Sequence, residues 1–175
     1  MSFIDVLPPL FKSHVTGTKN VDGDGHCGFR AIADLLDFGE EAWSRVRRDL
    51  MAELDEYTEM YEKVFVESGH VGAAMKVLDW FEDHAPHDHW FCLPEMGHLI
   101  ASAYNVVMVV LSPELSLTYL PLRTDIGRSP KVICIGLINS NHFIQVSLHS
   151  MCIVHTSLRR YQQNIDVFNT SFRCF

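Results

Sequence analysis

Residues 21–36 read VDGDGHCGFRAIADLL, an acidic glycine-rich turn followed by a segment with regularly spaced apolar residues. Four of these apolar residues fall on one face of a helix: Phe29, Ile32, Ala33 and Leu36. Cys27 therefore stands where a loop becomes a helix. We expect this helix to span residues 27–38, with Gly39 as its C-terminal cap.

The position of Cys27 has chemical consequences. The free backbone N–H groups in the first turn of a helix carry partial positive charge, so they favour a thiolate over a thiol. The same kind of group stabilises the oxyanion that forms when a thiolate attacks a carbonyl. Four backbone N–H groups are predicted to form this oxyanion hole: those of Asp24, Gly25, His26 and Cys27. On spacing alone, a buried structural cysteine is the alternative.

Three glycines surround the cysteine, at positions 23, 25 and 28. Glycine tolerates a positive φ and lets another backbone approach closely. We therefore expect these positions to allow a tight turn and the approach of a substrate backbone.

The composition indicates one globular domain. The chain has 175 residues, 47% of them apolar, which is enough for one core and too few for two domains. Its net charge of -8 argues against a nucleic-acid-binding surface and favours a basic partner. Five cysteines form no CxxC pair, which indicates a reducing compartment, the cytoplasm or nucleus. We expect a soluble protein, since no run reaches the roughly 18 apolar residues of a membrane span.

Three more helices are expected before residue 105. The first begins near Glu40, and its apolar residues recur at helical spacing: Trp43, Val46, Leu50, Leu54 and Tyr57. Acidic residues in this region are interpreted as a solvated face, with attraction of a basic partner as the alternative: Glu53, Asp55, Glu56, Glu59 and Glu62. The second helix carries four apolar residues at the same spacing: Val71, Met75, Leu78 and Phe81. The third spans residues 95–104.

A histidine-rich stretch precedes the last of these helices. Residues 84–92 read HAPHDHWFC and contain several side chains that can bind a metal ion. They stand too close together, around a proline, to match the spacing of a zinc site, and no second cysteine pair completes a tetrahedron. We interpret the stretch as a surface loop and expect no metal site.

Extended segments dominate the chain after Tyr104. Four apolar runs separated by turns are predicted to be strands: residues 105–111, 117–122, 131–138 and 142–148. A short run at 152–154 is expected to add an edge strand. Helices followed by strands predict an α+β fold, in which helical parts pack against a mostly antiparallel or mixed central sheet.

Three parts of the chain are distinguished. Residues 1–20 are assigned to an N-terminal arm, with an apolar part at 3–11 that packs on the domain and a polar connection at 13–20. Residues 21–150 form the predicted domain, and residues 151–175 form a C-terminal tail.

A cysteine nucleophile needs a base, and His142 is preferred among the ten histidines. It opens a strand directly after a loop, and alternation puts it on the same face as three apolar residues: Ile144, Val146 and Leu148. We expect its ring at the rim of the sheet, on the core side, where it can meet the start of the Cys27 helix. His26 is a poor base for its neighbour and is interpreted as a loop residue. The alternative for His142 is a semi-buried histidine without a catalytic role.

Two motifs in this sequence have a known counterpart. Residues 24–31, DGHCGFRA, resemble the D-G-x-C-x-F-R-A motif of the ovarian-tumour (OTU) family of cysteine deubiquitinases. Residues 141–143, NHF, are similar to the N-H-[FYW] motif of that family and follow in the same order. Further stretches, at residues 90–107 and 120–123, are similar to a plant branch of the family encoded beside Mutator-like transposable elements. The resemblance covers residues 3–150.

The resemblance implies an OTU-type cysteine protease fold and an isopeptidase that cuts after the C-terminal glycine of ubiquitin or a ubiquitin-like protein. It makes Cys27 the nucleophile, His142 the general base and Asp24 the residue that shapes the oxyanion loop. No metal ion or cofactor is needed. The implied partners are ubiquitin, a ubiquitin-like protein and polyubiquitin chains. We expect a monomer that binds neither nucleic acid nor membranes.

One position departs from the family pattern. Many members carry an Asp or Asn two residues after the histidine to orient its ring, and this chain has Ile144 there. Several groups could orient the ring instead: Asp22, which we prefer, Asp24, Asn139, Asn141 or a backbone carbonyl, and a bare Cys/His dyad is the further alternative. The departure supports a second hypothesis, an OTU-like module that binds ubiquitin without cutting it. A thiol acyltransferase of another fold is a third hypothesis, but it does not account for residues 24–31.

Overall fold

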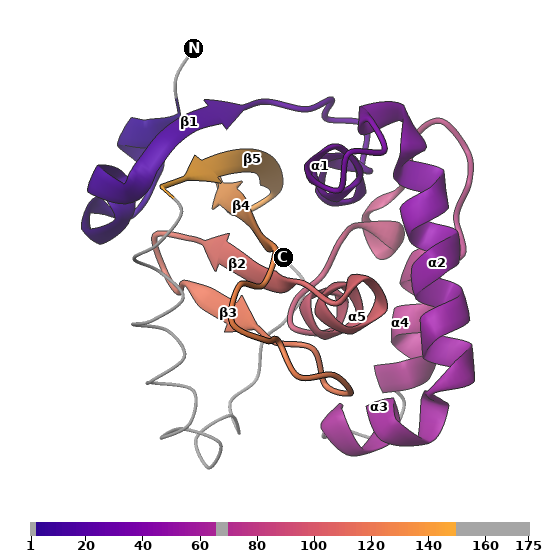
Figure 1. Cartoon of the computed structure of the whole chain (residues 1–175). Helices are drawn as coiled ribbons and strands as arrows, with labels where there is room; N and C mark the ends of the chain where they lie inside the picture. The colour runs from indigo at the N-terminus through magenta and orange to yellow at the C-terminus, as the bar shows by residue number, and fades with distance from the viewer. Residues whose placement is uncertain (1–2, 66–69, 150–175) are drawn as a thin grey trace.

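A five-stranded mixed sheet lies at the centre of the protein, whose computed structural model describes residues 3–65 and 70–149. The α-helices lie on one side of this sheet, and the N-terminal arm lies on the other (Figure 1). The predicted α+β class with a mixed central sheet is confirmed.

The sheet has the strand order β1-β5-β4-β2-β3. The strands are β1 (Val15–Lys19), β2 (Val107–Leu111), β3 (Leu117–Tyr119), β4 (Val132–Ile138) and β5 (His142–Leu148). β2 and β4 run parallel, and the other neighbouring pairs are antiparallel. The four strands predicted between residues 105 and 148 are confirmed, although β3 ends at Tyr119 rather than at residue 122. The edge strand predicted at 152–154 lies outside the described residues.

Strand β1 corrects the prediction of a polar connection at residues 13–20. Its sequence, VTGTK, has little apolar character, and it forms because its backbone pairs with β5, from Val15 opposite Leu148 to Lys19 opposite Gln145. An edge strand that is only partly buried needs few apolar residues. This pairing places the residues just before the cysteine loop alongside β5.

Helices α1 and α5 pack directly on the sheet, and α2 lies behind them (Figure 1). The α-helices are α1 (Cys27–Leu35), α2 (Trp43–Glu56), α3 (Thr58–Val64), α4 (His70–Leu78) and α5 (Glu95–Tyr104). Short 3-10 turns accompany them: η1 (Ile4–Val6), η2 (Pro9–His14), η3 (Glu40–Ala42) and η4 (His87–His89). Helix α5 has the predicted bounds, because its apolar period is unbroken and Asn105 ends it in a left-handed conformation.

Two helix boundaries differ from the predictions. Helix α1 ends at Leu35 rather than at residue 38, because Asp37 has a φ of 65° and leaves the helical path. Helix α4 ends at Leu78, so Phe81 lies beyond it and is exposed instead of packing on its apolar face.

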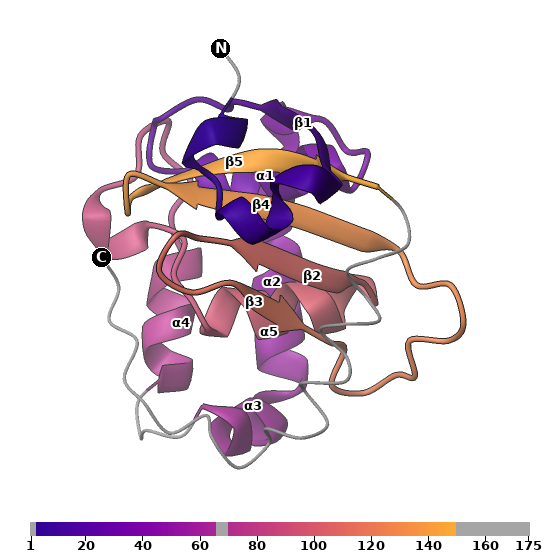
Figure 2. The same cartoon turned by 90° about the vertical axis from the view of Figure 1, so that its left-hand side faces the viewer.

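The two faces of the sheet contact separate cores. The larger core lies between the sheet and the helices and includes Phe29, Leu50 and Phe143. The smaller core lies under the N-terminal arm, where Leu7 packs with residues such as Val109 and Ile144. Figure 2 shows η1 and η2 in front of this face of the sheet. The apolar part of the arm therefore packs on the domain as expected.

Glu53 corrects the prediction of a fully solvated acidic face. It is only 8% exposed, and its carboxylate forms an ion pair with Arg123 at 2.6 Å and accepts a hydrogen bond from the Tyr61 hydroxyl at 2.8 Å. A carboxylate is buried in this way only when it is paired. Glu53 therefore ties α2 to α3 and to the connection between β3 and β4.

Candidate active site

Cys27 is the first residue of α1 and lines a cleft on the protein surface. The loop before α5, the β2–β3 connection, the β4–β5 turn and residues of strands β2 to β5 supply the rest of the wall. The lining residues are Cys27, Trp90, Phe91, Cys92, Leu93, Val110, Ser112, Glu114, Leu115, Leu117, Leu137, Ser140, Asn141 and Phe143. We call this feature the Cys27 cleft. It is mostly apolar, and Glu114 is the one carboxylate among its lining residues.

The Cys27 side chain is 8% exposed and faces several backbone N–H groups. Burial raises the pKa of the thiol, and the backbone N–H groups of Phe143, Gly28 and Cys27 oppose this effect without outweighing it. The predicted influence of the helix N-terminus is therefore present. The predicted preference for thiolate is wrong for the free protein, because desolvation of the charged form dominates. In the free protein Cys27 is a thiol that needs a base.

His142 stands half-buried at the rim of the sheet, as the first residue of β5. The alternation argument does not bring it to Cys27, because Ile144 and Val146 pack in the core under the N-terminal arm, whereas Phe143 packs on the helix side. The ring instead lies over the cysteine loop. A Cβ atom added to Gly23 would lie 3.9 Å from both Nδ1 and Cε1 of His142.

The His142 ring forms one hydrogen bond in the part of the chain that the structure describes. Its Nε2 lies 2.9 Å from Oδ1 of Asn20, the residue after β1, and no hydrogen bond joins the ring to Cys27. Burial lowers the pKa of His142, so the imidazole is neutral near pH 7. The resting pair is therefore a thiol and a neutral imidazole.

The orienting residues proposed from the sequence have other positions. None of the three is hydrogen-bonded to the ring among the described residues: Asp22, Asn139 and Asn141. The Asp22 N–H donates to Glu40 Oε1 at 3.1 Å, and the Asn141 N–H donates to the Ile138 carbonyl at 3.2 Å. Asn139 occupies the β4–β5 turn with a φ of 51°. Asn20 could have been found only from the pairing of β1 with β5, because no motif includes it.

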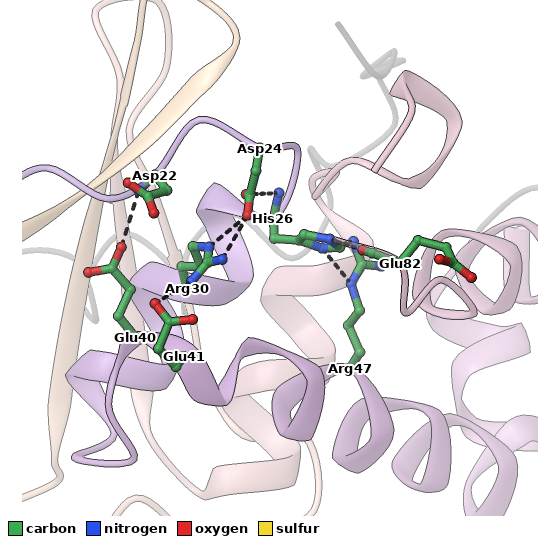
Figure 3. A network of polar contacts seen from close by, with 8 residues as sticks. All are labelled: Asp22, Asp24, His26, Arg30, Glu40, Glu41, Arg47 and Glu82. Carbon is green, nitrogen blue, oxygen red and sulfur yellow. Dashed lines mark hydrogen bonds and ion pairs between the residues drawn. The ribbon is translucent and has the colours of Figure 1, made fainter. Parts of the chain in front are cut away.

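Asp24 holds the cysteine loop through a partly buried ion pair with Arg30 (Figure 3). Its carboxylate accepts hydrogen bonds from the Arg30 guanidinium at 2.8 and 3.0 Å and from the His26 backbone N–H at 2.9 Å. Burial acts to raise the pKa of Asp24, but these contacts outweigh it and hold the pKa below its usual value. Since the His26 N–H already has an acceptor, it is not a free oxyanion donor, which corrects that part of the prediction.

His26 is not a simple loop residue. Its ring is fully buried and stacks on Trp43, with ring centroids 3.7 Å apart. Nε2 lies 2.9 Å from the Glu82 carbonyl, and Nδ1 accepts hydrogen bonds from the Arg47 guanidinium (Figure 3). Arg47, also fully buried, donates to the carbonyls of Val77 and His89 as well. This network fixes the residue next to Cys27.

The histidine-rich stretch is largely exposed, as expected of a surface loop, and it also supports the cysteine loop. The Ala85 N–H donates to the Asp24 carbonyl at 2.9 Å, and the Trp90 indole donates to the Ala85 carbonyl at 3.0 Å. Gly25 has a φ of 88°, and a Cβ atom there would collide with the Ala85 carbonyl oxygen. Among residues 3–65 and 70–149, no three His, Cys, Asp or Glu side chains form a group that could hold a metal ion.

Gly28 differs in role from the other glycines of the loop. It lies in α1, where a Cβ atom would collide with the Phe91 side chain. Its small size therefore serves the packing of the helix against the wall of the Cys27 cleft, and not the approach of a substrate backbone.

No helix in the described part of the chain has the length and apolar character that crossing a membrane requires.

No protein-family model and no curated relative matches this chain. Several solved structures do. The viral OTU domain protease from Dera Ghazi Khan virus is 15% identical and matches over 79% of this chain and 84% of its own, with a TM-score of 0.56. The OTU domain of OTUD1 is 15% identical over 75% of this chain and 85% of its own, with a TM-score of 0.54. The Hazara virus OTU bound to ubiquitin is 11% identical over 77% of this chain and 82% of its own, with a TM-score of 0.53. The chain therefore has the fold of the OTU domains.

Proposed function

We propose that this chain is a thiol-dependent deubiquitinase of the OTU family, an isopeptidase that cuts after the C-terminal glycine of ubiquitin or a ubiquitin-like protein. One observation carries the proposal. The Cys27 thiol lies at the N-terminus of α1, faces backbone N–H groups and lines an apolar cleft, while the His142 ring stands over the adjoining loop. The OTU fold, and a structural neighbour solved with ubiquitin, support the choice of substrate.

In the proposed reaction His142 accepts the proton of the Cys27 thiol, and the thiolate attacks the carbonyl carbon of the terminal glycine. Backbone N–H groups of the cysteine loop stabilise the oxyanion. When the tetrahedral intermediate collapses, the C–N bond to lysine breaks and the protonated His142 gives its proton to the leaving amine. Water then hydrolyses the thioester, which releases the ubiquitin carboxylate and restores the thiol.

The Cys27 cleft suits an extended peptide tail. Its apolar lining can bury aliphatic side chains, and Glu114 offers a carboxylate to a basic residue. The net charge of -8 likewise favours a partner whose tail carries arginines. We include polyubiquitin chains among the substrates and propose a monomer of the cytoplasm or nucleus. We also propose that the chain is related to the plant Mutator-associated branch of the family, because residues 90–107 and 120–123 are similar to stretches of that branch.

A second candidate function is an OTU-shaped module that binds ubiquitin without cutting it. The observation that favours it is the resting site itself, in which the pKa of Cys27 is raised and the thiol has no hydrogen bond to His142. Against it stands the survival of nucleophile, base and oxyanion loop together, since a binding module needs none of them.

A ubiquitin derivative with a C-terminal electrophile separates the two functions. The protease predicts covalent capture by the wild-type chain and none by Cys27→Ala. The binding module predicts reversible binding of ubiquitin by both proteins and capture by neither. Hydrolysis of differently linked diubiquitins then measures the linkage preference of an active enzyme.

A further inference from the structure

The His142 ring bonds to a residue outside both family motifs. Asn20 Oδ1 lies 2.9 Å from His142 Nε2, although the two residues are 122 positions apart. Ile144, at the position where the family resemblance places an orienting residue, is fully buried under the N-terminal arm and has no polar group. We propose that Asn20 is the positioning residue of His142 and completes a Cys27–His142–Asn20 arrangement. The inference rests on the proposed function.

The hydrogen bond determines which ring nitrogen can act as the base. Because the amide oxygen of Asn20 only accepts, Nε2 of His142 must carry the hydrogen, and Nδ1 keeps its lone pair. Nδ1 is on the edge of the ring that faces Gly23 and the cysteine loop. Asn20 therefore selects the tautomer whose free nitrogen is directed toward the part of the site that holds the nucleophile. A Cys-His-Asn arrangement is a known variant of the catalytic triad.

The pairing of β1 with β5 explains why Asn20 can reach the ring. Lys19, the last residue of β1, is opposite Gln145, so the chain continues through Asn20 toward the start of β5, where His142 stands. The chain then turns through Asp22 and Gly23 into the cysteine loop. One short segment thus supplies both the orienting amide and the nucleophile loop, and the position two residues after the histidine is free to be apolar.

Asn20 and an aspartate at the same place would act differently. A neutral amide fixes the tautomer but stabilises the imidazolium form less than a carboxylate, which fixes the tautomer and also raises the pKa of the ring. Burial lowers the pKa of His142, and no charged partner among the described residues raises it. Asn20 is exposed, so its replacement leaves the core unchanged and separates catalysis from folding.

The experiment compares wild type, Asn20→Ala and Asn20→Asp in hydrolysis of ubiquitin carrying a C-terminal fluorogenic amide. Thr16→Ala, an exposed position on the preceding strand β1, is the control. Asn20→Ala should lower kcat by about 10–100-fold with little change in KM. The loss is part of the rate enhancement that general base catalysis by His142 provides, because the ring is then less well positioned. Asn20→Asp should restore most of kcat and move the acidic limb of the kcat/KM profile to higher pH, because its carboxylate raises the pKa of His142. A purely structural role would give neither the rescue nor the pH shift.

A second measurement decides the inference even without turnover. In Cys27→Ser, nitrogen-15 NMR of His142 should show a protonated Nε2 and an unprotonated Nδ1, and Asn20→Ala should give a mixture of the two tautomers. Two results overturn the inference. One is an unchanged kcat in Asn20→Ala when the wild-type protein is active, and the other is a His142 ring that carries its proton on Nδ1 while Asn20 is present. Absence of turnover by wild type refutes the proposed function alone, and the tautomer still tests Asn20.

Discussion

The Arg47 guanidinium donates hydrogen bonds to Nδ1 of His26 from Nε at 3.2 Å and from Nη2 at 3.0 Å, inside the protein and next to Cys27. Both side chains are fully buried, and Arg47 has no ion-pair partner among the described residues. Burial lowers the pKa of Arg47 to about 10, yet the group remains charged at neutral pH. Carbonyl oxygens and His26 accept hydrogen bonds from the cation. The Phe29 ring also faces it, with the ring centroid 3.9 Å from the Cζ atom of Arg47.

Replacing Arg47 by methionine should remove the hydrogen bonds that hold the cysteine loop and destabilise the protein. The substitution keeps the aliphatic stem but leaves the Val77 and His89 carbonyls and His26 Nδ1 without donors. Unsatisfied buried groups cost about 1–3 kcal/mol each, and removal of a buried charge offsets part of this, so we expect a net loss of about 3 kcal/mol in the free energy of unfolding. Urea denaturation measures it. Arg48→Met, at the next and exposed position, should change the stability by less than about 0.5 kcal/mol.

The stability of the protein should fall between neutral pH and about pH 5 because of His26. Burial lowers the pKa of His26 from its ordinary value of 6.5, so the unfolded chain binds a proton in this range while the folded protein does not. The stabilising contribution is therefore complete above pH 6.5 and is lost as the pH falls toward the lowered pKa. Asp24 acts in a separate window below its ordinary pKa of 3.8, since its pKa is also lowered.

The His26 contribution can be isolated with His26→Gln, whose amide can still accept from Arg47 but does not titrate in this range. Free energies of unfolding of both proteins at several pH values between 5 and 8 give the difference. Other histidines with lowered pKa, His98 and His142, contribute equally to both proteins and cancel. A difference that stays constant across the range would contradict the assignment of His26 as a buried neutral acceptor.

His142→Ala and His26→Ala should fail in different ways. His142→Ala removes the base, so kcat/KM should fall by about 10²–10⁴-fold while the thermal unfolding midpoint stays near that of wild type. His26→Ala removes a fully buried ring that stacks on Trp43, so its main effect should be a lower midpoint. Hydrolysis assays at a temperature where both variants are folded should show the larger loss for His142→Ala. Equal losses there would argue against His142 as the base.

The sequence predicted elements whose apolar period is long and whose ends are marked. Helix α5 and strand β5 have the predicted bounds, and Cys27 begins a helix as expected. Strand β1 was missed because its stability comes from backbone pairing with β5, which side-chain periodicity does not report. Helix α1 was predicted too long because an aspartate at position 37 takes a left-handed conformation that the pattern did not require.

The polar contacts of the site were less predictable than its nucleophile. Cys27 and His142 stand in short motifs, whereas no motif includes Arg47, which is buried against His26, 21 positions earlier in the chain. The bond from Asn20 to His142 depends on a strand pairing between distant segments. A single sequence carries little signal for such contacts, because burial of a polar group depends on partners that only the fold brings together.

Two glycine substitutions should change stability in opposite directions. Gly28→Ala places a Cβ atom against the Phe91 side chain, and overpacking of this kind costs about 1–3 kcal/mol. Gly72→Ala lies on the exposed side of α4, where a Cβ atom meets nothing within 4 Å, so it should stabilise the protein by about 0.5–1 kcal/mol through helix propensity. Urea denaturation of both variants measures the effects. A stabilising Gly28→Ala would contradict the close packing of α1 against the cleft wall.

The resting state of Cys27 predicts slow alkylation near neutral pH. Since burial raises the pKa of the thiol and no hydrogen bond joins it to His142 in the described structure, the reaction with iodoacetamide should accelerate only above the ordinary thiol pKa of 9.0. His142→Ala should leave this profile unchanged while abolishing most of the turnover, because in the free protein the imidazole does not hold the thiolate. Labelling of Cys27→Ser measures the reaction of the other cysteines, and this amount is subtracted from the labelling of the wild-type protein. An inflection below pH 7 that disappears in His142→Ala would show a preformed thiolate–imidazolium pair and would refute the resting state described by the structure.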